Sequence, residues 1–296
     1  MMIAIAALAA GAGAYYWMHG PSTFGRASHA VQPVAASSSA LATTEKSSAI
    51  PSTPAPPGTA ELGNKAAPAG VASASEGAPL RPGEVLDFAA DVANLSNVAN
   101  LRLQIVDRRN FYGKNAWHLQ AFAHTQSPLR MVFELDDQFD SYSDAATLAS
   151  LQYEMHLNER GEKQESIQRM STGDSGRAAS NATETHVLPG TRDPLGMMQY
   201  LRTVDWAKSR EVRGPVYDGH KLYDVSARLA GAEQNIAVPA GNFSASKIEI
   251  HVFDSGAEMK DAHFALYLAA NPSRTPILLE AVMPFATARV ALVKMK

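Results

Sequence analysis

The chain has 296 residues, a formal net charge of −3 and no cysteine. The absence of cysteine excludes disulfides, thiolate zinc sites, a cysteine nucleophile and the lipid-carrying cysteine of bacterial lipoproteins. The slightly acidic charge provides no positive field for phosphates, so we expect no nucleic-acid partner.

The first 18 residues carry no charged side chain and end near Tyr15-Tyr16-Trp17. Eighteen helical residues just span a bilayer, and aromatic residues gather at its surface. We therefore predict a single-pass membrane anchor over residues 1–19. The small residues Ala12-Gly13-Ala14 leave open a cleaved signal peptide and secretion to the periplasm. Charge bias does not fix the orientation, because no Lys or Arg precedes the apolar run.

Residues 20–80 are rich in Ala, Pro and Ser, with runs such as Ser37-Ser38-Ser39 and Pro54-Ala55-Pro56-Pro57. This composition buries too little apolar surface to fold. We predict a disordered linker that carries the folded part away from the membrane.

Residues 81–296 are dominated by alternating apolar and polar positions. The pattern is clear in Ala99–Ile105, Leu151–Leu157, Tyr223–Leu229 and Ile248–Phe253. Such alternation indicates strands with one face in the core and one face in water. Turn signals separate the strands, which indicates antiparallel hairpins; they are Gly113-Lys114, Arg160-Gly161, Asp218-Gly219, Ser255-Gly256 and Asn271-Pro272.

One helix is predicted, beginning with Asp193 as a cap and Pro194 in the first turn, and ending near Asp205. Its apolar stripe contains Met197 and Leu201, which we expect to be buried against the sheet. The predicted fold is mainly β: an antiparallel, strongly curved sheet or barrel of about a dozen strands with one short helix.

Several stretches resemble the bacterial envelope family catalogued as domain of unknown function 3108. They are Pro82-Gly83-Glu84-Val85-Leu86, Phe133–Asp144, Asp193–Arg202, Pro239-Ala240-Gly241-Asn242-Phe243 and Lys247-Ile248-Glu249. The resemblance spans residues 81–296 and implies an exported, mainly β-domain with no catalytic residues to carry over. It therefore implies that the predicted anchor lies in the bacterial inner membrane, with the folded part in the periplasm.

The chain departs from the family near its C-terminus. The family tends to have a Trp-containing strand and an Asp pair before an Arg-Pro turn. Here the corresponding residues are Leu266-Tyr267-Leu268 and Asn271-Pro272-Ser273-Arg274.

Gly173-Asp174-Ser175-Gly176 matches the residues around the nucleophile of chymotrypsin-like serine proteases. Its surroundings are rich in Ser, Gly and Ala, and the His and Asp contexts of a protease are missing. We interpret the stretch as a loop.

The histidines give a weak metal hypothesis. His118 and His124 share a strand face but lie about 20 Å apart, too far for one ion. His156 or His251 would have to join one of them across strands. The alternative is that all four are exposed residues of the polar faces, and no zinc-like spacing is present.

The densest acidic cluster is Glu134, Asp136, Asp137, Asp140 and Asp144. It has enough oxygens for Ca²⁺ but lacks the spacing of an EF-hand loop. A solvated strand end is the alternative, and paired carboxylates of a glycosidase are a further one.

Large side chains on the apolar faces could line a cavity for a lipid-like ligand, or could simply be core. They are Leu101, Leu103, Trp117, Leu119, Tyr153, Met155 and Tyr223.

The function predicted from these observations is a membrane-anchored periplasmic β-domain that binds an apolar, lipid-like ligand or an envelope component. We expect no enzymatic activity, no catalytic residue, no cofactor and no metal. The alternatives are a structural or scaffolding protein that contacts an envelope protein partner, and a hydrolase that uses the acidic residues.

Overall fold

The computed structural model describes residues 80–172, 182–260, 263–283 and 286–296. The predicted anchor over residues 1–19, the linker up to residue 79 and the Gly173-Asp174-Ser175-Gly176 stretch lie outside the described residues. Among the residues that are described, no helix has the length and apolar character needed to cross a membrane.

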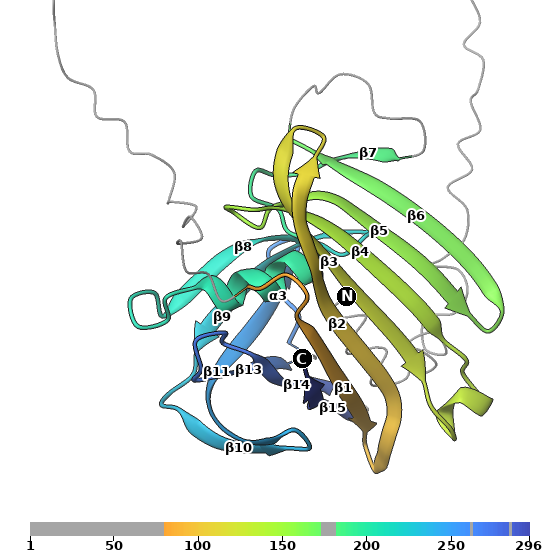
Figure 1. Ribbon diagram of the computed structural model, residues 1–296, viewed down its shortest axis with the longest axis vertical. Coiled ribbons are helices and arrows are strands. Elements are labelled where there is room, and N and C mark those ends of the chain that lie inside the picture. Colours follow the sequence, from red (N-terminus) through yellow and green to blue (C-terminus); the bar gives the residue numbers. More distant parts are fainter. Residues whose placement is uncertain (1–79, 173–181, 261–262, 284–285) are drawn as a thin grey trace, which may run out of the picture. The chain divides into compact units, whose positions relative to one another are not determined.

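The described part is mainly β, with one α-helix and one short 3₁₀ helix (Figure 1). The elements in chain order are β1 (Val85–Val92), β2 (Leu95–Phe111), β3 (Lys114–Thr125), η2 (Leu129–Met131), β4 (Asp136–Asp144), β5 (Ser150–Glu159), β6 (Glu162–Ser171), β7 (Thr183–His186), α3 (Pro194–Thr203), β8 (Glu211–Tyr217), β9 (Leu222–Leu229), β10 (Gln234–Val238), β11 (Gly241–Asp254), β12 (Ala257–Glu258), β13 (His263–Ala269), β14 (Pro276–Met283) and β15 (Ala286–Met295).

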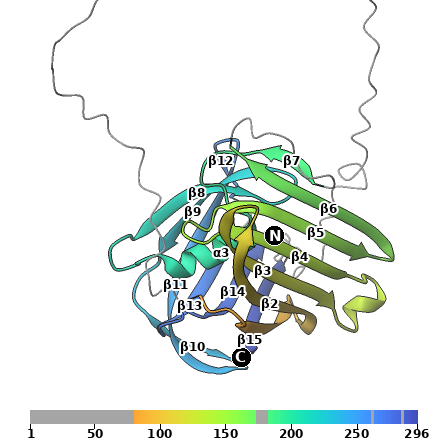
Figure 2. The same cartoon turned by 45° about the horizontal axis from the view of Figure 1, so that its top comes forward.

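The described strands form one 15-stranded sheet in the order β7-β6-β5-β4-β3-β2-β1-β15-β14-β13-β11-β9-β8, with β10 and β12 paired to β11. The pairings between these strands are antiparallel except for the parallel pair β6–β7. Strands β7 and β8 are the two edges, so the sheet does not close into a barrel. Figures 1 and 2 show the sheet curling around α3. The structure therefore confirms the predicted strongly curved, mostly antiparallel sheet. The sequence also allowed a closed barrel, and the sheet does not form one.

The strand positions follow the alternation in the sequence. On β2, Leu101, Leu103 and Ile105 are buried, whereas Arg102 between them is exposed. The predicted strand Ile248–Phe253 is the second half of the longer β11. The predicted turns lie at the ends of strands, and Asp218-Gly219 joins β8 to β9 as expected.

Helix α3 begins where the sequence predicts it and ends at Thr203, two residues earlier than expected. Asp193 caps it by accepting a hydrogen bond from the Gly196 N–H at 2.9 Å. Met197 and Leu201 are 1% and 0% exposed, so the predicted burial of the apolar stripe is confirmed.

The segment just before α3 links the two sides of the curled sheet. The Arg192 N–H donates to the carbonyl of Pro215, and the Arg192 carbonyl accepts from the Tyr217 N–H, so this segment runs along the edge of β8. The neighbouring Thr191 carbonyl accepts from the N–H of Ser150 at the start of β5. These backbone bonds hold α3 on the inner side of the sheet, between β5 and β8.

The apolar inner face and α3 belong to one hydrophobic core cluster. Six of the seven side chains that we considered as cavity lining are buried in it, and Tyr223 packs against it; the buried six are Leu101, Leu103, Trp117, Leu119, Tyr153 and Met155. The cluster also contains Leu195, Met197, Met198 and Leu201 of α3. The inner face of the sheet is thus in contact with the helix.

Candidate functional site

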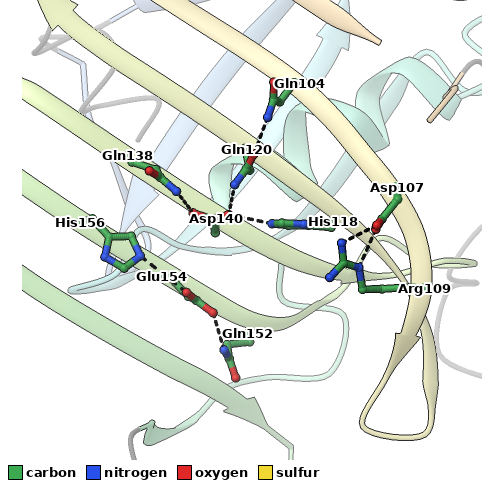
Figure 3. Close-up of polar contacts among 10 residues, drawn as sticks. All are labelled: Gln104, Asp107, Arg109, His118, Gln120, Gln138, Asp140, Gln152, Glu154 and His156. Atoms are coloured by element: carbon green, nitrogen blue, oxygen red, sulfur yellow. Dashed lines mark hydrogen bonds and ion pairs between the residues drawn. The ribbon is translucent and has the colours of Figure 1, made fainter. Parts of the chain in front are cut away.

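The outward face of β2 to β5 carries a continuous set of polar side chains (Figure 3). It arises from alternation: on β3, Leu119 and Ala121 point into the core, so His118 and Gln120 project to the other side. We call this surface the polar face; its members are Gln104, Asp107, Arg109, His118, Gln120, Gln138, Asp140, Tyr142, Gln152, Glu154 and His156.

Strand register aligns these residues in rows across the sheet. Gln104 is opposite Gln120, Gln120 opposite Asp140, and Asp140 opposite Glu154. Directly opposed side chains in a sheet lie about 5 Å apart, which is close enough for side-chain hydrogen bonds. Antiparallel pairing thereby brings together residues that are up to 50 positions apart in the chain.

Asp140 is the centre of the polar face. Its Oδ1 accepts hydrogen bonds from Gln120 Nε2 at 2.6 Å and pairs with His118 Nε2 at 2.7 Å. Its Oδ2 accepts from Gln138 Nε2 at 2.7 Å. Burial alone would raise the pKa of Asp140, but the bonds from His118, Gln138 and Gln120 outweigh it and lower the pKa below its ordinary value. Asp140 is therefore a buried carboxylate held in its ionised form.

His118 is buried on the polar face, with 7% of its surface exposed. Its ring stacks on Tyr142 with centroids 4.6 Å apart, and Tyr142 stacks in turn on Phe111 at 4.0 Å. Nε2 faces Asp140, whereas Nδ1 is buried and has no hydrogen-bond partner among the described residues. A buried nitrogen without a partner costs free energy, so this atom calls for an explanation.

A second, separate network of polar contacts lies over β5 and β6 (Figure 3). Gln152 Nε2 donates to Glu154 at 2.6 Å, and Gln152 Oε1 accepts from Arg169 at 3.1 Å. His156 Nε2 lies 3.6 Å from Glu154 Oε2. The polar face therefore holds two networks, and the second reaches Arg169 on β6.

A groove of about 570 Å³ adjoins the polar face on its β1 side. It is lined by Asp87, Phe88, Asn100, Leu101, Arg102, Gln104, Phe122, His124 and Val293. Gln104 belongs to both regions, because its Nε2 donates to Gln120 on the polar face. The groove and the polar face thus form one candidate site.

The structure separates the four histidines of the metal hypothesis. His118 and His124 are on the same strand face, as predicted, but His118 pairs with Asp140 and His124 lines the groove. His156 is on β5 near Glu154. His251 is on β11 and pairs with Glu258 at 2.6 Å. Within the described ranges, no three potential metal-ligating residues converge.

The acidic cluster is also divided. Glu134 and Asp136 pair with Arg130 at 2.6 and 2.7 Å, and Asp144 accepts backbone N–H bonds of the turn that follows it. Of the other two, Asp140 lies on the polar face and Asp137 points to the inner side. The five carboxylates therefore do not share one cleft, as calcium binding or glycosidase chemistry would require.

Asp137 has the most perturbed environment of these acids. It is 5% exposed and accepts a hydrogen bond from the Asn158 N–H at 2.9 Å. Burial raises its pKa to about 7, and the charges of Glu159 and Asp136 add to the effect. The group therefore titrates near neutral pH.

Two of the stretches that carried the family resemblance, those with Glu84 and Arg202, have a structural role around α3. Arg202, which is fully buried, donates to both oxygens of Glu84 at 2.7 and 2.8 Å and to the Ser273 carbonyl at 2.9 Å. Arg274 donates to the carbonyls of Arg202 and Val204. The C-terminal segment that departs from the family pattern still holds the end of the helix.

Sequence reasoning did not single out the glutamines of the polar face. The sequence pattern that could have identified them is the recurrence of glutamine at the polar positions of successive predicted strands. Gln104, Gln120, Gln138 and Gln152 lie on β2, β3, β4 and β5.

Three solved structures resemble this chain at low identity. A β-barrel-like protein with domain of unknown function DUF1849 from Brucella abortus has a TM-score of 0.47 and 10% identity, over 73% of this chain and 97% of that one. A "putative lipoprotein" from Parabacteroides distasonis has a TM-score of 0.36 and 11% identity, over 74% and 98%. A "putative exported protein" from Bacteroides fragilis has a TM-score of 0.28 and 11% identity, over 73% and 96%.

No curated protein sequence matches the chain significantly. One family model does match, over residues 88–293, and this range covers most of the predicted β-domain. The suspected resemblance is thereby confirmed, and the chain belongs to the family described as protein of unknown function DUF3108.

Proposed function

We propose that this protein is a non-enzymatic binding protein of the bacterial cell envelope, and that its ligand lies on the polar face and in the adjoining groove. The observation that carries the proposal is the buried His118–Asp140 pair at the centre of an outward sheet face. Nδ1 of His118 is left without a partner there, at a cost of about 1–3 kcal/mol. Buried polar atoms are nearly always paired, and we interpret the unpaired one here as a mark of a functional surface.

A binding role fits the chemistry better than a catalytic one. A general acid or base works best when its pKa lies near the operating pH, but the hydrogen bonds to Asp140 lower the pKa of that carboxyl. The remaining acids of the predicted cluster point in other directions. The polar face offers fixed hydrogen-bonding groups, which suits recognition.

The apolar ligand predicted from the sequence would occupy the inner side of the sheet. The side chains proposed to line its cavity contact α3 and one another in the core cluster. This packing favours the outward face as the binding site. The envelope location rests on the predicted anchor and linker.

The proposal is tested by replacing Phe122 in the groove with a photocrosslinking amino acid, in full-length protein produced in a bacterial envelope. Val282, an exposed apolar residue on β14, is the control position. After irradiation, intact-mass spectrometry of the purified protein detects covalent adducts. We expect an adduct of defined mass at position 122, absent at position 282, and lower in yield when Gln104→Leu is added.

Equal labelling at both positions, or an adduct whose yield is unchanged by Gln104→Leu, would refute the outward site. Native mass spectrometry of the same preparation before irradiation provides a second check. A stoichiometric lipid that co-purifies with both the parent protein and Gln104→Leu would instead place the ligand inside the sheet.

A further inference from the structure

The polar face is unusually rich in primary amides. Gln104, Gln120, Gln138 and Gln152 occupy it on four successive strands, and Asn100 lines the adjoining groove. Each amide group has two N–H donors and a carbonyl acceptor. A surface of this kind matches a ligand whose own groups both donate and accept hydrogen bonds.

The hydrogen bonds within the polar face orient these amides without exhausting them. Gln104, Gln138 and Gln152 each donate one N–H, to Gln120, Asp140 and Glu154 respectively. A second N–H of each has no partner among the described residues, and neither does Oε1 of Gln104 or Gln138. The network therefore fixes side chains that would otherwise rotate, which lowers the entropic cost of binding.

Two of the four carboxylates of the candidate site pair with arginines, and the other two, Asp140 and Glu154, accept hydrogen bonds from neutral glutamines. Arg102 pairs with Asp87 at 2.7 Å, and Arg109 pairs with Asp107. Asp140 receives three hydrogen bonds from its neighbours. An anionic ligand such as a phosphate or a uronate would meet no unpaired cluster of arginines or lysines, which such ligands require. The site fits an uncharged ligand.

The groove adds an apolar contribution. Phe122 and Val293 line it beside Arg102 and Gln104, so apolar and hydrogen-bonding groups stand next to one another. A sugar ring presents the same combination, since its C–H groups form an apolar face and its hydroxyls lie around the rim. Aromatic side chains pack well against such apolar faces, while polar neighbours fix the orientation.

The extent of the site favours a chain over a single sugar. Neighbouring strands lie about 4.8 Å apart, so the polar face measures about 14 Å from β2 to β5 before the groove is added. A surface of this length accommodates several sugar units in a row.

We infer that the ligand of the polar face and groove is an uncharged glycan chain, recognised by the oriented amides of Gln104 and Gln138 and by the apolar wall at Phe122. The inference rests on the proposed function and names its ligand class.

The test is affinity gel electrophoresis of the full-length protein through gels that contain a neutral β-glucan, a galactomannan or a dextran. A gel with polygalacturonate and co-sedimentation with phosphatidylglycerol vesicles are the two anionic arms. The variants are Gln104→Leu and Gln138→Leu, which remove the amides at similar side-chain size. Gln234→Leu is the matched control, because Gln234 is an exposed glutamine on β10, outside the site.

We expect at least one neutral glycan to retard the parent protein and Gln234→Leu equally. Gln104→Leu and Gln138→Leu should each weaken binding about five- to tenfold, the range for one or two lost hydrogen bonds. Unchanged thermal melting of these variants will show that the fold is intact.

Binding only to polygalacturonate or vesicles, reduced by the same two variants, would overturn the glycan and leave the proposed function standing. Glycan binding that is equal in all four proteins would overturn the assignment of this site. Failure of every probe to bind also overturns the inference, and the crosslinking at position 122 then decides the proposed function separately.

Discussion

The substitution Asp137→Asn should stabilise the protein at neutral and alkaline pH. Asp137 is buried on the inner side of β4, where burial raises its pKa to about 7 from an ordinary value of 3.8. Asparagine has nearly the same shape and keeps an oxygen that can accept the Asn158 N–H. The substitution therefore removes the titration and preserves the hydrogen bond.

The sign follows from proton linkage. Between pH 4 and 7 the folded state holds the proton of Asp137 more tightly than the unfolded state, so stability falls as the pH rises through that window. Each pH unit corresponds to about 1.4 kcal/mol while the unfolded state is ionised and the folded state is protonated. From pH 5 to pH 7 the loss is about 2 kcal/mol, and it levels off above the folded pKa.

The assay is urea unfolding of full-length protein and variant between pH 5 and 8.5, followed by tryptophan fluorescence. The stability of Asp137→Asn relative to the parent protein should increase by about 3 kcal/mol over this range. Asp136→Asn is the matched control on the neighbouring residue. The hydrogen bond from Arg130 lowers the pKa of Asp136, so its substitution should cost stability at neutral pH and little at low pH.

Between pH 5 and 8.5 the cost of Asp136→Asn should be constant, because this carboxyl titrates only at lower pH. A difference that changes with pH for Asp137→Asn beside a constant one for Asp136→Asn would be difficult to explain by a general change in net charge. A constant difference between Asp137→Asn and the parent protein would show that Asp137 is not protonated near neutral pH. A benefit that shrinks with rising pH would reverse the sign and refute the reasoning.

Three further predictions concern α3, a turn and the polar face. Arg202→Met should lower the free energy of unfolding by about 3–5 kcal/mol in urea titrations, because it leaves the buried Glu84 carboxylate unpaired; adding Glu84→Gln should recover part of the loss. Gly219→Ala should lower stability by about 1–3 kcal/mol, seen as a lower Tm, because this buried turn residue has φ +103° and a methyl group would collide with a methionine side chain. His118→Leu should raise the pKa of Asp140, measured by carboxyl ¹³C NMR, because it removes a hydrogen bond that favours the ionised form.

Much of the fold was predictable because local patterns determine it. The alternation around Leu101 and Leu103 specified a strand, and Asp193 followed by Pro194 specified the start of the helix. Whether the sheet would close into a barrel was not predictable, since this depends on how its two edge strands, β7 and β8, lie relative to each other. In the structure, Arg192 forms backbone hydrogen bonds along the edge of β8, and no local sequence pattern predicts these bonds.

The candidate site was predictable only in fragments. The sequence placed His118 on a polar strand face and Asp140 in an acidic cluster, but their contact depends on the register of β3 against β4. Register is set by the whole sheet, including the bulge between Ile105 and Asp107 on β2. The acidic cluster misled for the same reason, because successive residues such as Asp136 and Asp137 point to opposite faces of a strand.

The two faces of the sheet divide the roles of the charged residues. On the inner side, Arg202 and Asp193 are fully buried. Arg202 donates to Glu84, and Asp193 accepts from the Gly196 N–H. The motifs that contain these residues therefore hold the helix in place. A group that is committed to several internal bonds has little capacity left for a ligand. On the outer side, the amides of Gln104 and Gln138 keep spare donors and acceptors, and His118 has a buried nitrogen without a partner. Resemblance to the family through Glu84, Asp193 and Arg202 therefore predicts a shared fold, whereas ligand preference should depend on the outward positions of β2 to β5, two of which, Gln138 and Asp140, lie in the family stretch Phe133–Asp144.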